Sequence, residues 1–151
     1  MEKQFRYIFA FLSLLGFALQ SCGGNAQKAS ENKNEEIKAI TIISSGGQMG
    51  YSSFFKITKD SIKFSSYLAV DTTQNTTSNK RINPQDWNDI IAGIDLENFK
   101  NATNGHSVQP VDGIDTEILV NTNNGEISKM NAYDNEMWNC IQEKLSEYLS
   151  H

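Results

Sequence analysis

The feature that most constrains this 151-residue chain is an apolar run close to its N-terminus. Residues 7–19 (YIFAFLSLLGFAL) are mostly apolar, and Lys3 and Arg6 place positive charge before them. A helix that spans a bilayer needs about 20 apolar residues, so this run is too short to cross a membrane. A positive start followed by a short apolar run is typical of an export signal that is later removed. The folded part of the chain is therefore expected outside the cytoplasm.

The apolar run ends at the first of only two cysteines. The sequence there is Leu19-Gln20-Ser21-Cys22, with an apolar residue three positions before the cysteine and a small residue directly before it. This arrangement resembles the lipobox of bacterial lipoproteins. The resemblance implies that residues 1–21 are a signal peptide, that Cys22 carries acyl chains, and that these chains hold the protein to a lipid bilayer. The alternative is an ordinary secreted protein in which Cys22 lies near the cleavage site by chance.

The rest of the chain has the size and charge of a single acidic domain. The full chain has 13 basic and 18 acidic side chains; removal of residues 1–21 takes away Lys3, Arg6 and Glu2 and leaves 11 basic and 17 acidic side chains, a formal charge of −6, with Arg81 as the one arginine. Such a chain is repelled by phosphate backbones and by anionic lipid heads, so nucleic acid is excluded as a partner. With Cys22 acylated, Cys140 has no disulfide partner in the chain. We expect a monomer.

Residues 22–36 form a polar segment directly after the lipid attachment site. The stretch GGNAQKASENKNEE contains no large apolar residue and cannot bury enough surface to offset the entropy lost on ordering. We expect a flexible tether at residues 22–36 and one globular domain at residues 37–151. The expected location is the cell envelope, at the outer membrane, on its periplasmic or surface face. Gly23 and Gly24 give no acidic sorting signal, so the membrane and the face stay open.

Five segments of the globular part have the alternating or β-branched pattern of strands. They are residues 37–44, 51–58, 62–70, 114–120 and 126–133. Asn124-Gly125 between the last two predicts a hairpin with a type I′ turn, whose two central residues need positive φ. The polar residues 71–79 are expected to form a loop or a ragged sheet edge, and residues 101–112 a long polar loop.

Two helices are predicted to cover the sheet. The first begins at Asn83-Pro84, an N-cap followed by a proline, and its Trp87, Ile90, Ile91 and Ile94 lie on one face. The second spans residues 134–150 and is also amphipathic. The connections are mostly too short for parallel crossovers. The expected fold class is α+β, with an antiparallel sheet of about five strands and two helices packed on one face.

Residues that carry out catalysis are sparse in this sequence. His106 lies in the long polar loop and His151 at the end of the chain, and neither has the spacing of a metal ligand. Cys140 lies at the margin of the apolar helix face, where a thiol acts as a small hydrophobe. We therefore expect no catalytic residue, no metal, no cofactor and no enzymatic activity.

One acidic cluster is a weaker candidate for a metal site. Asp112, Asp115 and Glu117 lie within six residues and offer oxygen ligands for calcium, but the rest of a calcium-binding loop is absent. If residues 114–120 form a strand, Asp115 and Glu117 share its solvent face. The structural interpretation is favoured over a metal site.

The candidate binding residues are Gly46, Gly47, Gln48, Met49, Gly50 and Tyr51. This glycine-rich segment lacks the lysine and hydroxyl residue of a phosphate-binding loop and lies between two strands. We interpret it as an exposed loop that contacts an unknown envelope protein, in a non-catalytic binding module. Two alternatives stay open: a scaffold or assembly subunit of an envelope complex, and an envelope enzyme or ligand carrier that uses His106 with Asp112 or Asp115.

Three segments carry resemblances that cover most of the domain. Residues 45–50 (SGGQMG), 94–99 (IDLENF) and 112–115 (DGID), in this order after the lipobox and tether, resemble small uncharacterised lipoproteins of Bacteroidota. Residues 45–50, the late hairpin and the closing helix are similar to emfourin, a protein inhibitor of thermolysin-like metallopeptidases. The second resemblance implies that the protein partner is a peptidase.

Two tripeptides resemble the acceptor pattern of the general O-glycosylation system of Bacteroidota. They are Asp60-Ser61-Ile62 and Asp71-Thr72-Thr73. The implied acceptors are Ser61 and Thr72, of which Thr72 lies in the loop that we expect to be exposed.

Overall fold

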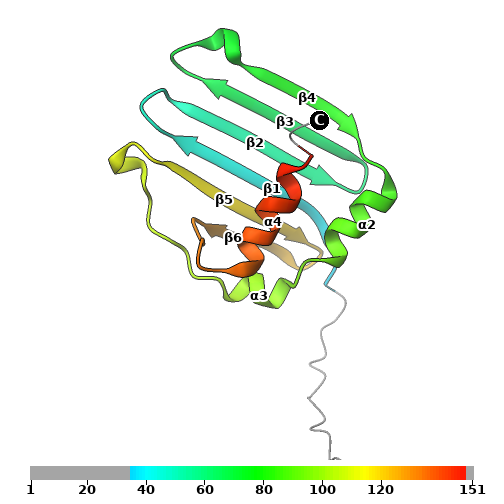
Figure 1. Cartoon of the computed structure of the whole chain (residues 1–151). Coiled ribbons are helices and arrows are strands. Elements are labelled where there is room, and N and C mark those ends of the chain that lie inside the picture. The colour runs from blue at the N-terminus through cyan, green and yellow to red at the C-terminus, as the bar shows by residue number, and fades with distance from the viewer. Residues whose placement is uncertain (1–34, 149–151) are drawn as a thin grey trace, which may run out of the picture. The chain divides into compact units, whose positions relative to one another are not determined.

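The structure, a computed structural model, describes residues 35–148. The export signal, Cys22, residues 23–34 of the tether and His151 lie outside the described residues. The described part contains one six-stranded antiparallel sheet with the strand order β4-β3-β2-β1-β5-β6 (Figure 1). Its strands are β1 (Ile37–Gly46), β2 (Tyr51–Thr58), β3 (Ser61–Leu68), β4 (Thr76–Arg81), β5 (Ile114–Thr122) and β6 (Gly125–Met130).

One face of the sheet is apolar because every second residue of neighbouring strands points the same way. Ile40 of β1 pairs with Ile57 on one side and with Val120 on the other, and all three side chains are fully buried. Ile42 pairs with Phe55 and Ile118 in the next row of the same face. These rows form the centre of the hydrophobic core.

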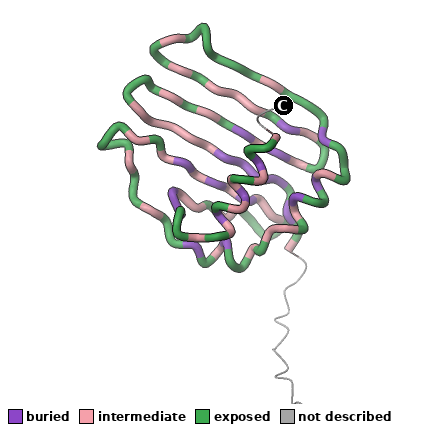
Figure 2. The backbone as a smooth tube through the Cα atoms, in the orientation of Figure 1, coloured by how far each residue is buried: buried purple, intermediate pink, exposed green. Residues whose placement is uncertain are grey.

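Helices cover this apolar face. They are α2 (Pro84–Ala92), α3 (Leu96–Asn101) and α4 (Glu136–Ser146), and Figure 1 shows them on the viewer's side of the sheet. The side chains of Asn83, Asp95 and Asn135 cap them by accepting a hydrogen bond from a backbone N–H of the first turn. Buried residues concentrate where helices and sheet meet (Figure 2). None of the helices within residues 35–148 has the length and hydropathy to cross a membrane.

The α+β class and the antiparallel sheet are confirmed, and two elements were not predicted. β4 was not counted as a strand, because most of it lies in residues 71–79, whose lack of apolar residues predicted a loop or a ragged sheet edge. It is an edge strand paired only with β3, so its side chains need no buried face. No separate helix was predicted at α3. It forms a helix because Asp95 caps it and Phe99 is fully buried.

The β5–β6 hairpin is confirmed, but the predicted turn type is wrong. Thr122 pairs with Gly125, so the two loop residues are Asn123 and Asn124. Of the non-glycine residues between 35 and 148, only Asp112 and Asn131 have positive φ, and a type I′ turn at the hairpin is therefore excluded. Instead, the Thr122 hydroxyl accepts a hydrogen bond from the Asn124 N–H over 3.1 Å within the turn.

Candidate functional site

Three connections meet at one end of the sheet, and we call this region the loop end: residues 46–51, 69–75 and 107–114. The Gly47 N–H donates a hydrogen bond to the Gly113 carbonyl over 3.0 Å, and Gln48 Nε2 donates one to Asp112 Oδ2 over 2.7 Å. Gln109 Nε2 donates to the Ser45 carbonyl over 3.2 Å. The glycine-rich turn is therefore fixed to the long loop that precedes β5.

The third connection lies against the same turn on its other side. The Ala69 N–H donates to the Gly50 carbonyl over 3.2 Å, and the Val70 N–H donates to the Met49 carbonyl over 3.4 Å. The following 3₁₀ turn, Thr72–Gln74, is capped by Asp71. Backbone hydrogen bonds therefore join all three connections into one surface.

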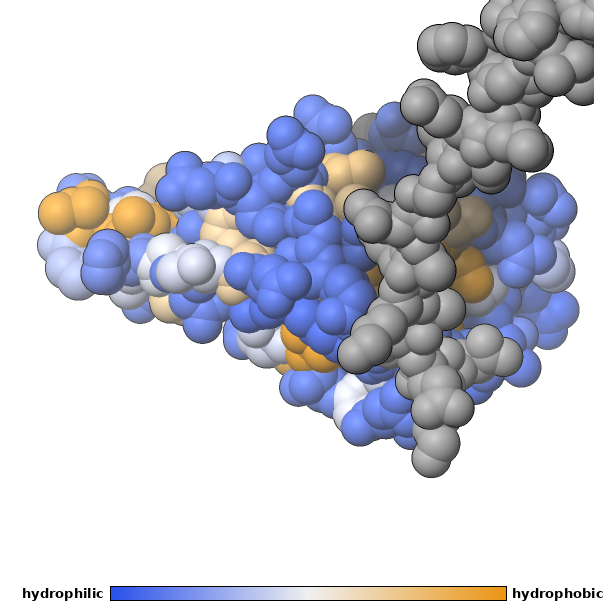
Figure 3. Space-filling view, turned by 90° about the horizontal axis from the view of Figure 1, so that it is seen from below, coloured by the Kyte–Doolittle hydropathy of each residue, from blue (hydrophilic) through white to orange (hydrophobic). Residues whose placement is uncertain are grey.

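Large apolar side chains are exposed on this surface. Met49 is 52 % exposed, Val70 62 %, Val111 79 % and Ile114 42 %, and they come from all three connections. In Figure 3 apolar atoms gather at the left tip of the described part, the side on which Figure 1 shows the turn after β1 and the loop before β5. Contiguous exposed apolar surface is typical of sites that bind other proteins or ligands. Of the predicted binding residues, only Met49 belongs to this apolar group.

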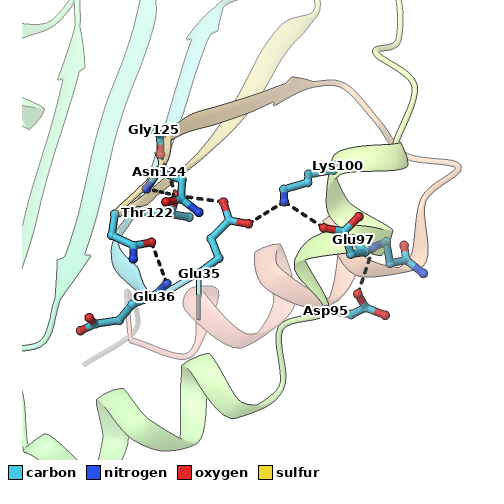
Figure 4. Close-up of polar contacts among 10 residues, drawn as sticks. Glu35, Glu36, Asp95, Glu97, Lys100, Thr122, Asn124 and Gly125 are labelled. Atoms are coloured by element: carbon cyan, nitrogen blue, oxygen red, sulfur yellow. Dashed lines mark hydrogen bonds and ion pairs between the residues drawn. The ribbon is translucent and has the colours of Figure 1, made fainter. Parts of the chain in front are cut away.

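The loop end lies far from the point where the described chain begins. β1 starts at Ile37 and reaches the loop end at Gly46 after ten residues, which is about 30 Å of strand. At its start, Glu35 accepts hydrogen bonds from Lys100 Nζ over 2.6 Å and from Thr122 Oγ1 over 3.0 Å (Figure 4). These contacts lower the pKa of Glu35, mainly through Lys100, and fix the entry of the chain into the domain.

Two of the glycines make a testable pair. Gly46 has φ +133°, and a Cβ there would overlap the Gly113 carbonyl oxygen, whereas Gly47 has φ +72° and a Cβ there would make only ordinary van der Waals contacts at 3.8 Å. We expect Gly46→Ala to lower the free energy of unfolding by about 2 kcal/mol or more, because backbone must move. Gly47→Ala should cost about 1 kcal/mol, the strain of a left-handed residue. Urea denaturation of both variants measures the difference, and equal losses would contradict this geometry.

The long loop before β5 is held by a buried amide that the sequence did not reveal. Asn131 is 4 % exposed and has φ +48°, and its Nδ2 donates to the His106 carbonyl over 2.9 Å and to Asp115 Oδ1 over 2.8 Å. Its Oδ1 accepts from the Thr116 N–H over 2.8 Å. Asp115 also accepts from Ser107 Oγ over 2.6 Å. These bonds fix the loop that carries Val111.

The Asp115 carboxylate predicts a pH effect on stability. Hydrogen bonds from Ser107, the Val108 N–H and Asn131 lower the pKa of Asp115 below its usual 3.8. A lowered folded-state pKa stabilises the fold above the unfolded-state value, and this contribution disappears as the pH falls through the folded-state value. Asp115→Asn should therefore destabilise the protein at pH 7, and the difference from the wild type should shrink as the pH falls below the usual carboxyl pKa of 3.8. Thermal unfolding across this range checks it; a constant difference would contradict it.

The structure shows what each candidate catalytic or metal-binding residue contacts. Asp115 is bonded to loop donors, Asp112 accepts from Gln48, and Glu117 accepts from the Ser128 hydroxyl. His106 is exposed and contributes its backbone carbonyl to Asn131. Within residues 35–148 no three His, Cys, Asp or Glu side chains are close enough to hold a metal ion.

The remaining candidates lie away from the loop end or at its rim. Cys140 is a free, half-buried thiol on α4. Thr72 is exposed at the start of the 3₁₀ turn, whereas Ser61 is half-buried and its hydroxyl lies 3.2 Å from Thr58 Oγ1. Accessibility therefore favours Thr72 over Ser61 as the acceptor for a glycan, in the order that the sequence suggested.

A separate open cleft of about 470 Å³ lies between residues 101–105 and 131–135. Its lining is mainly amide and hydroxyl side chains, with Tyr133 51 % exposed at its edge. Its only ionisable lining residues are Asp134 and Tyr133, and two isolated groups of this kind do not form an acid and base pair. No sequence pattern marks this cleft, because its two walls are about 30 residues apart in the chain.

In comparisons with known proteins, no protein-family model matches the chain, and no curated protein matches it significantly.

Proposed function

We propose that this protein is a lipoprotein of the cell envelope, anchored through acyl chains on Cys22, whose domain binds another protein through the loop end. The observation that carries the proposal is the exposed apolar group Met49, Val70, Val111 and Ile114 on three joined connections. It lies at the opposite end of β1 from the N-terminal segment. A domain tethered at one end and apolar at the other is suited to presenting that end to a partner.

The loop end has the physical properties of a protein-binding surface. Loops fixed on a rigid scaffold lose little entropy on binding, and here backbone hydrogen bonds fix them. Exposed apolar anchors surrounded by polar groups are typical of such interfaces. Gln48, Asp112 and Gln109 supply polar groups beside the apolar ones. The proposed domain is non-catalytic, and the resemblance to emfourin makes a metallopeptidase the first partner to examine.

Negative charge introduced into the loop end tests whether this region is the binding surface. The double variant Met49→Asp with Val111→Asp should lose the partner proteins that a tagged full-length wild type captures after crosslinking in intact cells. The control is Asn124→Asp, an exposed residue in the β5–β6 turn at the opposite end of the sheet. It should capture the same proteins as the wild type. If the double variant captures an unchanged set of proteins, the loop end is not the binding site.

The anchor is tested independently of the partner. The wild type should enter the detergent phase when Triton X-114 separates, and Cys22→Ala should stay in the aqueous phase because the acyl chains are lost. Equal partition of the two proteins would remove the lipoprotein part of the proposal and leave the binding surface to its own test.

A further inference from the structure

The face of the sheet opposite the helices is open in the described part of the chain, since α2, α3 and α4 all cover the other face (Figure 1). The strand register gives the residues of this open face. Ile43 pairs with Phe54 on β2 and with Glu117 on β5, so these three side chains form one row. Lys63, Arg81 and Glu126 point to the same side from β3, β4 and β6.

Charge is divided between the two halves of the sheet. Residues 51–81, which contain β2, β3 and β4, carry five basic and two acidic side chains, a formal charge of +3. Residues 114–130, which contain β5 and β6, carry one basic and three acidic side chains, a formal charge of −2. The ion pairs among residues 35–148 use only Lys38 and Lys100 as cations, so the basic side chains of β2 to β4 are unpaired. The total charge of the chain conceals this division.

On the open face the division runs from one sheet edge to the other. Lys63 and Arg81 lie on the β3–β4 half, and Glu117 and Glu126 lie on the β5–β6 half. Between them, on the two central strands, Phe54 is 36 % exposed and Ile43 is half-buried. Lys56 of β2 lies on the same face, one row from Phe54, because it pairs with Thr41 and with Lys63. The face therefore has one central apolar row, with basic side chains on the β2–β4 side and acidic side chains on the β5–β6 side.

We propose that a second copy of this chain binds this face, so that two open faces pack together about a two-fold axis parallel to the strands. This symmetry places β4 over the partner's β6, β3 over the partner's β5, and β2 over the partner's β1. Basic and acidic halves then face each other, whereas an axis across the strands would oppose like charges. Two aligned sheets packed in this way form a sandwich about 10 Å thick.

The register makes the contacts specific. Arg81 and Glu126 lie in the same row across the sheet, through Ser61, Thr58, Ala39 and Asn121. Arg81 therefore meets the partner's Glu126. Phe54 meets the partner's Ile43 at the centre, and Lys63 lies one row from the partner's Glu117. Each contact occurs twice, as an isologous interface requires.

The area of the face is sufficient for a modest dimer. Six strands about 4.8 Å apart, each offering about seven residues at 3.3 Å, give roughly 600 Å² per copy. Two copies then bury about 1,200 Å², the lower limit of specific interfaces, so the expected dimer dissociates readily on dilution. The sequence-based expectation of a monomer and this proposal exclude each other.

A charge exchange tests the dimer with full-length protein. Variant one, Lys63→Glu with Arg81→Glu, makes the face acidic, and variant two, Glu117→Lys with Glu126→Lys, makes it basic. Copies with two different tags are expressed together, and the amount of the second tag captured through the first is measured. The matched control, Lys59→Glu with Lys80→Glu, makes the same charge change off this face, because Lys59 lies in a turn and Lys80 pairs with the buried Ile62.

The wild type and the control should each capture a second copy of themselves. Each variant alone should capture about tenfold less of its own second copy. When variant one and variant two are expressed together, the captured amount should return to that of the wild type. The proposal is overturned if the wild type captures no second copy or if either variant still captures itself. It is also overturned if variant one and variant two do not capture each other. The binding of variant one and of the wild type to vesicles containing phosphatidylglycerol is also measured. Loss of vesicle binding with no self-capture by the wild type would assign the basic half to a membrane surface instead.

Discussion

Trp138→Ala should lower the free energy of unfolding by about 3–5 kcal/mol, a large fraction of the 5–15 kcal/mol typical of a single domain. Trp138 is fully buried where α4 meets the sheet, and its Nε1 donates to the Lys129 carbonyl over 3.2 Å. Its ring also meets Tyr133 edge to face, with 4.9 Å between the ring centroids. The substitution removes all three interactions and leaves a cavity.

The matched control lies on the exposed side of the same helix. Glu143→Ala should change the free energy of unfolding by less than about 0.5 kcal/mol, because surface substitutions without partners rarely do more. Urea denaturation measures both variants. If Trp138→Ala costs no more than Glu143→Ala, then α4 is not packed on the sheet as described, and the core needs a different explanation.

Asn131→Ala is expected to cost about 3 kcal/mol and to release the loop before β5. The substitution leaves the buried Thr116 N–H without its acceptor and removes a donor from Asp115. It also leaves alanine at φ +48°, where an asparagine is better tolerated. Because this loop carries Val111, the variant should also bind the partner more weakly.

Asn131→Gly separates the hydrogen bonds from the backbone strain. Glycine accepts positive φ freely, so this variant loses the same bonds without the strain and should be more stable than Asn131→Ala by about 1 kcal/mol. Hydrogen exchange of the amides of residues 105–113 should rise in both variants. Unchanged protection there would show that Asn131 does not hold the loop.

The main elements of the fold could be predicted from the sequence because their apolar residues have a clear period. Phe55 and Ile57 alternate with polar residues in β2, β1 is a run of β-branched apolar residues, and Trp87 and Ile90 have helical spacing. β4 has no such period because an edge strand exposed on both faces buries nothing. The wrong turn type has a similar cause, since the Thr122 hydroxyl decides between turns that the dipeptide alone does not distinguish.

The candidate site could be predicted only in part, for the same physical reason. The glycines marked residues 46–50 as a turn. The contact between this turn and residues 107–114 depends on hydrogen bonds such as the one from Gln48 to Asp112, which joins positions 64 apart in the chain. Val70 joins the surface only because β3 pairs with β2 in its particular register. The division of charge on the open face likewise emerges only when the strand order is known.

The most direct test of the account places a photo-crosslinking amino acid at Val111, which is 79 % exposed, and in a second protein at Asn124. Both proteins are made full length and irradiated in intact cells. The account predicts that Val111 yields a discrete adduct with another envelope protein, lost when Met49→Asp is added, and that Asn124 yields no such adduct. An adduct from Asn124 alone, or no adduct from Val111, would contradict it.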